Sequence, residues 1–142
     1  MSKNTNIWLN GIMGVVVGDA LGRPVQFESR AEVAQHPITG MRGLGTFNLP
    51  EGSWTDDSSL TLALLESIGR LGKIDLDDIM ENLMKWLYDG EFTPFGTAYD
   101  IGIGTRQAIG EYSNNRNAQK CGSDKEWNNG NGGLIRIIQL VK

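Results

Sequence analysis

Apolar residues recur at intervals of three or four along much of the chain, a spacing that an α-helix converts into one apolar face. The clearest example lies between Asp75, which can cap a helix, and Asp89-Gly90, which can end it. Its apolar face comprises Ile79, Leu83, Trp86 and Leu87. A preceding helix is predicted from about Ser58 to a stop at Gly72. Its stripe comprises Leu60, Leu64, Ile68 and Leu71.

Three more helices are predicted on the same grounds. They cover Ile7 to Leu21, span Ile101 to Tyr112, and begin after Asn131. The residues expected to face inward from the second of these are Ile101, Thr105, Ala108 and Ile109. Segments 40–53 and 113–129 are rich in glycine or polar residues and are predicted to be loops. The sequence therefore predicts an all-α fold.

The first predicted helix carries an unusual row of glycines. Gly11, Gly14, Gly18 and Gly22 follow one another at intervals of three, four and four, so they share one helical face. Each glycine costs helix stability by roughly 1 kcal/mol relative to alanine. Two interpretations account for this cost: another helix packs closely against the bare face, or a ligand approaches it.

Charge and cysteine content narrow the class of partner and the compartment. The net charge of −4 argues against binding to nucleic acid or to an anionic membrane, because both need a basic surface. Cys121 is the single cysteine, which excludes an internal disulfide and a cysteine-rich zinc site. Residues 1–6 lack the apolar core of a signal peptide, and the longest apolar stretch, 12–17, is too short to span a bilayer. We expect a single-domain cytoplasmic protein.

The last predicted helix is apolar on several faces between Leu134 and Val141, a pattern typical of a buried helix. The other predicted helices offer few neighbours that could bury it. We therefore expect residues 1–142 to form part of a larger domain, the N-terminal portion of an incomplete helical bundle. Self-association through exposed apolar helix faces could cover the same surface.

Two adjacent carboxylates precede the helix predicted from Ser58. They belong to the segment Trp54-Thr55-Asp56-Asp57-Ser58-Ser59. Helix capping explains one or two of these polar residues, but it does not explain two neighbouring acids, whose charges repel. Mg²⁺ would remove this repulsion, because it takes oxygen ligands from one or two carboxylates and from water. Thr55, Asp56 and Asp57 are therefore candidate metal ligands, and capping is the alternative.

Two glycine-rich segments open predicted helices and can expose backbone N–H groups to a phosphate. They are Asp100-Ile101-Gly102-Ile103-Gly104-Thr105-Arg106 and Asn129-Gly130-Asn131-Gly132-Gly133-Leu134-Ile135-Arg136. Their spacing matches neither the P-loop nor the dinucleotide-binding fingerprint. Two such segments beside an acidic candidate site indicate a ligand that carries phosphate.

Asp19 occupies an unfavourable position at the end of the first predicted helix, where the helix dipole opposes a negative charge. It therefore needs a partner, either an amide group or a cation. The simpler interpretation is a capping network at the C-terminus of its own helix.

Four motifs, in this order along the chain, resemble those of the ADP-ribosylglycohydrolase family. The first is Gly18-Asp19-Ala20-Leu21-Gly22-Arg23-Pro24-Val25, and the second is Gly52-Ser53-Trp54-Thr55-Asp56-Asp57-Ser58-Ser59-Leu60-Thr61-Leu62. The third joins Phe92-Thr93-Pro94-Phe95-Gly96 with the segment that begins at Asp100, and the fourth is the segment that begins at Asn129. The motifs span nearly the whole chain.

The resemblance implies an all-helical fold around a two-magnesium centre, and cleavage of the bond between ADP-ribose and an acceptor. By position, Thr55, Asp56 and Asp57 look like the first half of the metal site, and Asp56 and Asp57 like catalytic residues. The implied substrate contacts come from Gln26, Gly102, Gly104, Thr105, Asn131, Gly132 and Gly133. The implied partner is ADP-ribose or an ADP-ribosylated acceptor. Paired metals can orient ribose hydroxyls and activate water, and the ribosyl transition state resembles an oxocarbenium ion.

Two departures from the family pattern limit what is expected of these residues. The chain lacks the family's second acidic motif, Asp-x-Asp-Thr, so we expect weak, single-metal binding and little or no turnover by the chain alone. Gln26 stands where many members have a glutamate that gates the site, and a glutamine cannot shuttle a proton. A non-catalytic module that binds ADP-ribose or a nucleotide, and a degenerate truncated relative, are the alternatives.

Overall fold

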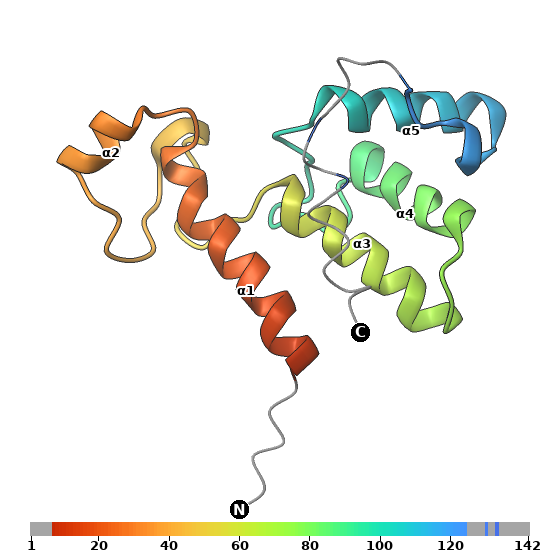
Figure 1. Cartoon of the computed structure of the whole chain (residues 1–142), viewed down its shortest axis with the longest axis horizontal. Helices are drawn as coiled ribbons and strands as arrows, with labels where there is room; N and C mark the ends of the chain where they lie inside the picture. Colours follow the sequence, from red (N-terminus) through yellow and green to blue (C-terminus); the bar gives the residue numbers. More distant parts are fainter. Residues whose placement is uncertain (1–6, 125–129, 131–132, 134–142) are drawn as a thin grey trace, which may run out of the picture.

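The computed structural model describes residues 7–124, 130 and 133 (Figure 1). Its elements, in chain order, are α1 (Ile7–Gly22), the 3₁₀ helix η1 (Arg23–Val25), α2 (Arg30–Gln35), the 3₁₀ helix η2 (Gly45–Phe47), α3 (Asp56–Leu71), α4 (Leu76–Asp89), α5 (Ile103–Asn115) and the 3₁₀ helix η3 (Ala118–Lys120). Within these residues, β-type pairing is limited to an isolated bridge between Leu44 and Leu49. The predicted all-α fold is confirmed for this part of the chain.

Helix α3 occupies the centre of the arrangement (Figure 1). It packs against α1 and against α4, and α4 in turn packs against α5. Helix α2 lies at the far side of α1 from the α3–α5 group. The start of α3 therefore lies between α1 and the elements that lead into α5.

The buried core lies between α3, α4 and α5. It comprises Leu60, Ala63, Met80, Leu83, Trp86, Ile109 and Tyr112. Leu60, Trp86 and Ile109 are fully buried, as the predicted stripes require. The side-chain amide of Asn82 donates to the carbonyl of Ala63 at 3.0 Å and ties α4 to α3 within this core.

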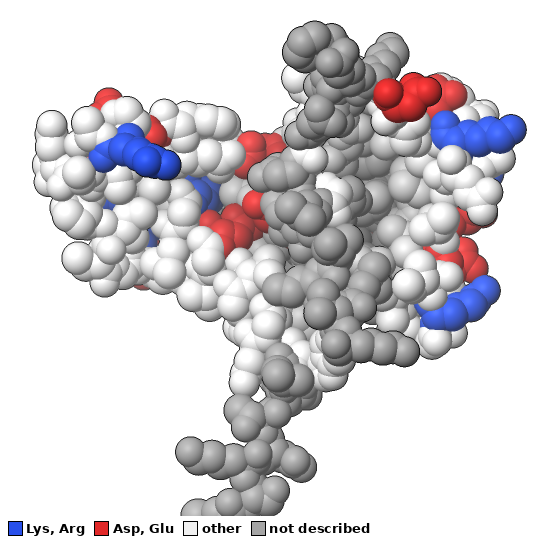
Figure 2. All heavy atoms as spheres, in the orientation of Figure 1, with Lys and Arg blue, Asp and Glu red and all other residues white. Residues whose placement is uncertain are grey.

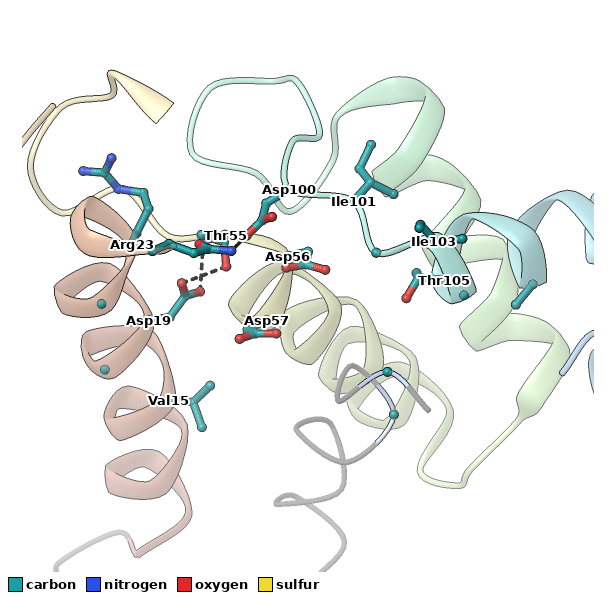
Figure 3. A pocket seen from close by; sticks show the side chains of 18 of the residues that line it. Val15, Asp19, Arg23, Thr55, Asp56, Asp57, Asp100, Ile101, Ile103 and Thr105 are labelled. Carbon is teal, nitrogen blue, oxygen red and sulfur yellow. Dashed lines mark hydrogen bonds between the residues drawn. The ribbon is translucent and has the colours of Figure 1, made fainter. Parts of the chain in front are cut away.

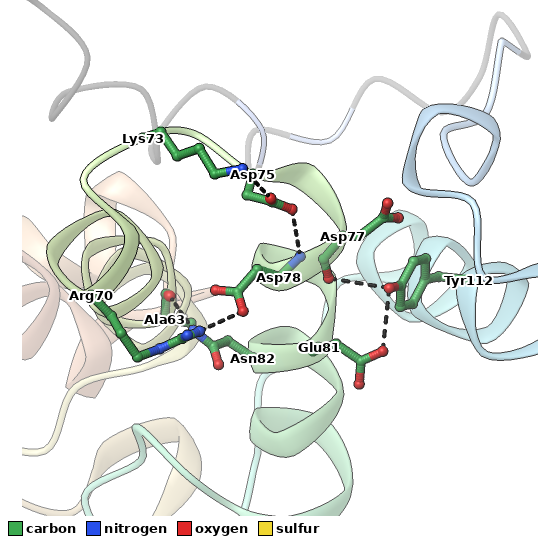
Figure 4. A network of polar contacts seen from close by, with 9 residues as sticks. All are labelled: Ala63, Arg70, Lys73, Asp75, Asp77, Asp78, Glu81, Asn82 and Tyr112. Atoms are coloured by element: carbon green, nitrogen blue, oxygen red, sulfur yellow. Dashed lines mark hydrogen bonds and ion pairs between the residues drawn. The ribbon is translucent and has the colours of Figure 1, made fainter.

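A polar network joins the outer ends of α3, α4 and α5 (Figure 4). The Tyr112 hydroxyl donates to the carbonyl of Asp77 at 3.1 Å and lies 3.2 Å from Glu81 Oε1. Arg70 pairs with Asp78, and the neighbouring Ser67 hydroxyl and the Arg70 guanidinium hold the pKa of the Asp78 carboxyl below its usual range. Because the Arg70 side chain is exposed, this ion pair contributes little to stability.

The helix-end signals at α3 and α4 act as predicted. The side chain of Asp75 caps α4 by accepting the Asp78 N–H at 3.2 Å. Gly72 ends α3 at φ +66°, and Gly90 ends α4 at φ +73°. Both glycines adopt the left-handed conformation that other residues reach only at a cost.

Two predicted boundaries and two predicted loops are corrected by the structure. The predicted loop 40–53 contains the short 3₁₀ helix η2. α3 begins at Asp56 rather than at Ser58, because its first turn is capped from α1, as described below. α5 covers Ile103–Asn115 instead of 101–112, since Gly102 at ψ 139° leaves Ile101 outside the helix. The predicted loop 113–129 therefore begins with helical residues, and it also contains η3.

Helix α2 was not among the predicted helices. It has six residues and no buried side chain, so it leaves no apolar stripe in the sequence. The available signal was local: Ser29 and Glu32 form a reciprocal capping box, in which the Ser29 N–H donates to Glu32 Oε2 at 2.7 Å.

Gly90→Ala is expected to lower the free energy of unfolding by about 2–4 kcal/mol. A Cβ at Gly90 would lie 2.0 Å from the carbonyl oxygen of Gly96, in addition to the strain of its positive φ. Gly72→Ala is the matched control, because it has a similar φ but nothing within 4 Å, and it should cost only about 1 kcal/mol. Urea unfolding compares the stability of the two variants. Equal losses of stability would contradict the close approach of Gly90 to the backbone of Gly96.

Helix α1 exposes a row of apolar side chains, here called the α1 ridge. Leu9, Met13 and Val17 follow at intervals of four and are 53%, 49% and 41% exposed.

None of the described helices is long and apolar enough to cross a membrane. The helix predicted after Asn131, with the apolar stretch 134–141, lies outside the described residues.

Candidate functional site

The carboxylate of Asp19 caps α3 from the neighbouring helix α1. Asp19 Oδ2 accepts the N–H groups of Thr55 at 2.9 Å and Ser58 at 3.1 Å. The hydroxyl of Thr55 donates to Oδ1 at 2.8 Å (Figure 3). The hydroxyl of Ser58 donates to Oδ2 at 2.5 Å. Asp19 was predicted to need either an amide group or a cation as a partner, and backbone amide groups fill this role. The prediction of a capping network on its own helix is wrong. The partial positive charge at the N-terminus of α3 stabilises the Asp19 carboxylate. This offsets the repulsion from the partial negative charge at the C-terminus of α1.

Because Asp19 does the capping, Asp56 and Asp57 are left without that role. Both project from the first turn of α3 into the space between α1 and α5 (Figure 3). Burial, followed by the charges of Asp57, Asp100 and Asp19, raises the pKa of Asp56 to about 7. Burial, with the charges of Asp19 and Asp100, also raises the pKa of Asp57. Among the described residues, the charged groups that act on the two carboxylates are themselves acidic, so the carboxylates are poorly neutralised there.

These side chains line a cavity of about 1070 Å³ between α1 and the α3–α5 group. The cavity brings together the predicted site residues that the structure describes: Gln26, Thr55, Asp56, Asp57, Gly102, Gly104, Thr105 and Gly133. Asn131 and Gly132 lie outside the described residues. Acidic side chains are visible in the hollow between the two sides of the molecule (Figure 2). The acidic motif and both glycine-rich segments thus reach one cavity.

The glycine row of α1 faces this cavity. Gly14, Gly18 and Gly22 line it, and a Cβ added at any of them would meet nothing within 4 Å. Among the described residues no helix packs on this bare face. Within the described residues the row is thus open to the cavity, as the ligand interpretation requires.

Arg23 fixes the loop that leads to the acidic motif. Its guanidinium is buried and donates to carbonyl groups of that loop. The acceptors are Ser53 at 3.2 Å, Leu44 at 2.8 Å, Pro50 at 3.2 Å, and Arg42 and Leu49 at 3.4 Å. Gly45 permits this close approach, since a Cβ there would lie 2.1 Å from the Pro24 carbonyl oxygen. The sequence showed Arg23 within a motif but gave it no role.

Tyr99 and Trp54 tie the acidic motif to the segment before α5. The Tyr99 hydroxyl donates to the carbonyl of Trp54, and the Trp54 indole N–H donates to the carbonyl of Phe92 at 3.1 Å. The Tyr99 ring packs edge-on against Phe47, with centroids 5.4 Å apart. Burial and the charge of Asp19 raise the pKa of Tyr99 to about 12, so the phenol remains a neutral donor.

Asp100 is an acidic member of the cavity wall that the sequence did not single out. Its charge acts on both Asp56 and Asp57, and its own carboxylate accepts Gln26 Nε2 at 2.6 Å. The sequence prediction for the segment that begins at Asp100, a phosphate-binding helix start, rests on its glycines alone. An acid directly before those glycines was the available signal.

The chemistry of the donor set fits a magnesium ion only in part. The described residues hold no group of three or more histidine, cysteine, aspartate or glutamate side chains placed to enclose a metal. Mg²⁺, however, is commonly held by one or two carboxylates with water and substrate phosphates completing the shell. Asp56 and Asp57 offer two carboxylates, and the Thr55 hydroxyl, which donates to Asp19, keeps its lone pairs for a cation. The fit is to a partial site.

Comparisons with known proteins agree on one family. The sequence profile described as ADP-ribosylglycohydrolase matches residues 6–141. ADP-ribosylarginine hydrolase Tri1 of Serratia proteamaculans is 34% identical over 125 residues, which cover 88% of this chain and 33% of that protein. ADP-ribosyl-[dinitrogen reductase] glycohydrolase of Rhodospirillum rubrum is 33% identical over 132 residues, 92% of this chain and 42% of that protein.

A solved structure shares the fold. It is titled ADP-ribosylglycohydrolase-related protein complex, and it superposes with a TM-score of 0.74 at 32% identity. The match covers 94% of this chain and 41% of that one. The chain thus spans well under half the length of the proteins to which it is similar.

Proposed function

The chain belongs to the ADP-ribosylglycohydrolase family, and from this premise we propose that it supplies the first half of the active site of a magnesium-dependent ADP-ribosyl hydrolase. The observation that carries the proposal is the meeting of the acidic motif with both glycine-rich segments at one cavity. Substrate would be an ADP-ribosylated acceptor, and the name of the Serratia relative suggests arginine as the modified side chain.

Binding of the diphosphate is assigned to the start of α5. Free N–H groups at a helix N-terminus attract a phosphate, and Gly102, Gly104 and Thr105 line the cavity there. Gly133 adds backbone from the second glycine-rich segment, with Asn131 and Gly132 proposed beside it. The bare face of α1 on the opposite wall leaves room for the sugar.

The acidic residues are assigned to the ribose that carries the scissile bond. Thr55, Asp56 and Asp57 would hold Mg²⁺, which supplies Lewis acidity and a lowered pKa for bound water. The carboxylate oxygens of Asp56 and Asp57 can also accept a proton from the water that attacks the anomeric carbon. Their negative charge, which no cationic side chain in the described part of the cavity neutralises, favours the positive charge of an oxocarbenium-like transition state.

The experiment replaces the matched segment of the Rhodospirillum rubrum glycohydrolase with this chain and measures release of ADP-ribose from ADP-ribosylarginine. We expect release that depends on Mg²⁺ and stops with a chelator, and little or no release from the 142-residue chain alone. Asp56→Asn should reduce the rate by about 100-fold or more, whereas Asp89→Asn, at the exposed end of α4, should not. A folded chimera without activity would contradict the enzyme, and activity of the chain alone would contradict the incomplete site.

A second candidate function is a non-catalytic module that binds ADP-ribose. The observation in its favour is Gln26, which lines the cavity but cannot shuttle a proton. Calorimetry with ADP-ribose separates the two functions, because saturable binding by a chimera that hydrolyses nothing would support the module.

We also propose that the chain expressed alone self-associates through the α1 ridge. Sedimentation velocity should show dimers or larger species, and Met13→Glu should return the chain to a monomer because it places a charge in the ridge. A monomeric wild-type chain would contradict this. A cytoplasmic location without nucleic-acid or membrane partners stays a prediction from charge and composition.

A further inference from the structure

One side-chain hydrogen bond joins two walls of the cavity. Gln26 Nε2 donates to Asp100 Oδ2 at 2.6 Å and connects the end of η1 with the entrance to α5, 74 positions away in the sequence. Both side chains are half-buried and both line the cavity. The bonded pair therefore lines the same cavity as Asp56 and Asp57.

Asp100 has physical reasons to leave its position. Its backbone adopts φ +53°, a left-handed conformation that is uncommon outside glycine. Its negative charge acts on Asp56 and on Asp57. Because like charges repel, an unrestrained Asp100 would rotate away from the acidic pair and toward solvent.

The other ionisable groups that the structure describes in this region do not hold Asp100. They are Asp19 from α1, Asp56 and Asp57 from α3, and the phenol of Tyr99. Among the described lining residues Arg23 is the one cation, and its guanidinium donates to carbonyl groups of the 42–53 loop. The amide of Gln26 is the donor that the structure gives to the Asp100 carboxylate.

Gln26 is well placed to restrain a neighbour because its own backbone is fixed on both sides. Its N–H donates to the carbonyl of Arg23 at 3.2 Å, and its carbonyl accepts the hydroxyl of Thr46 at 2.5 Å. Arg23 is itself buried and tied to the loop that precedes the acidic motif. The Gln26 amide therefore projects from an anchored segment.

We propose that Gln26 is a positioning residue that keeps Asp100 beside Asp56 and Asp57 whether or not a divalent cation is present. An uncharged amide suits this role, because it donates to a carboxylate without a proton that titrates near neutral pH. The cavity wall at the entrance to α5 is then formed before any cation or ligand arrives, which lowers the ordering cost of binding. The part of this inference that concerns a cation rests on the proposed function.

The test is ¹⁵N relaxation by NMR on the 142-residue chain in the absence of divalent cations. Gln26→Leu removes the donor at similar size, and Gln26→Glu replaces it with a charge that repels Asp100. Gln35→Glu, at the exposed end of α2, is the matched control for the change of charge. We expect backbone order parameters near about 0.85 at residues 99–101 in the wild type and the control, and below about 0.6 in both Gln26 variants.

Unchanged order parameters in both Gln26 variants would overturn the proposal. A readout specific to the contact is the side-chain amide signal of Gln26, which should shift in Asp100→Asn and stay unchanged in Asp89→Asn. Millimolar Mg²⁺ should restore order in Gln26→Glu, where two carboxylates can share the ion, but not in Gln26→Leu. If Mg²⁺ alters no spectrum, the proposed cation site fails, while the cation-free comparison still decides the role of Gln26.

Discussion

Asp19→Ala is expected to lower the free energy of unfolding by about 2–4 kcal/mol. The change removes a carboxylate that accepts two backbone N–H groups and two hydroxyls at the start of α3. Loss of the Asp19 charge also relieves repulsion with Asp56 and Asp57, which offsets part of the cost. The unmade hydrogen bonds outweigh this gain, because Thr55 and Ser58 are buried.

Asp89→Ala is the matched control, because Asp89 also lies at the end of an apolar-faced helix but is exposed. It should change stability by less than about 0.5 kcal/mol. Asp19→Asn should fall between the two, since an amide keeps one acceptor oxygen and loses the charge. Chemical denaturation followed by circular dichroism measures all three, and an Asp19→Ala loss no larger than that of Asp89→Ala would show that α3 does not depend on a cap from α1.

Asp56→Asn is expected to act in the opposite direction and to stabilise the cation-free protein at pH 8. The pKa of Asp56 is raised to about 7, against an unfolded value of about 3.8, so the folded state holds a proton that the unfolded chain releases between these values. Stability of the wild type therefore falls as pH rises from about 4 to about 7, by about 1–2 kcal/mol after allowance for solvent screening. The asparagine variant lacks this loss.

The same variant should lose its response to cations. Mg²⁺ that binds the folded wild type raises its melting temperature by mass action, and Asp56→Asn removes one of the proposed ligands. Differential scanning fluorimetry at pH 5 and pH 8, with Mg²⁺ and with chelator, gives both results. A variant that is less stable than the wild type at pH 8 without cations, or an equal Mg²⁺ response in both proteins, would contradict the assignment of Asp56.

The helices could be predicted from the sequence wherever one local pattern determined them. Asp75 and Gly90 bound α4 as expected, and Trp86 is fully buried on the predicted face. α2 was missed because six residues without a buried side chain leave no periodic pattern. Local signals thus predicted α4, which contributes side chains to the core. They did not predict α2, which contributes none.

Which residues come together at the cavity could be predicted only in part. Neighbouring acids in one segment identified Asp56 and Asp57, and the glycines identified the α5 entrance. The contacts that hold these segments together join residues 36 or 74 positions apart, as in Asp19 with Thr55 and Gln26 with Asp100. No spacing along the chain encodes such pairs, so the capping role of Asp19 and the position of Asp100 required the fold.

A titration of the chain with Mn²⁺, followed by electron paramagnetic resonance of the free ion, tests most directly whether the acidic pair on α3 binds a divalent cation. We predict weak but saturable binding of a single ion by the wild type and by the control Asp89→Asn. The double variant Asp56→Asn, Asp57→Asn should leave the ion free. Equal binding by the double variant, or no saturable binding by the wild type, would contradict the cation site proposed at the start of α3.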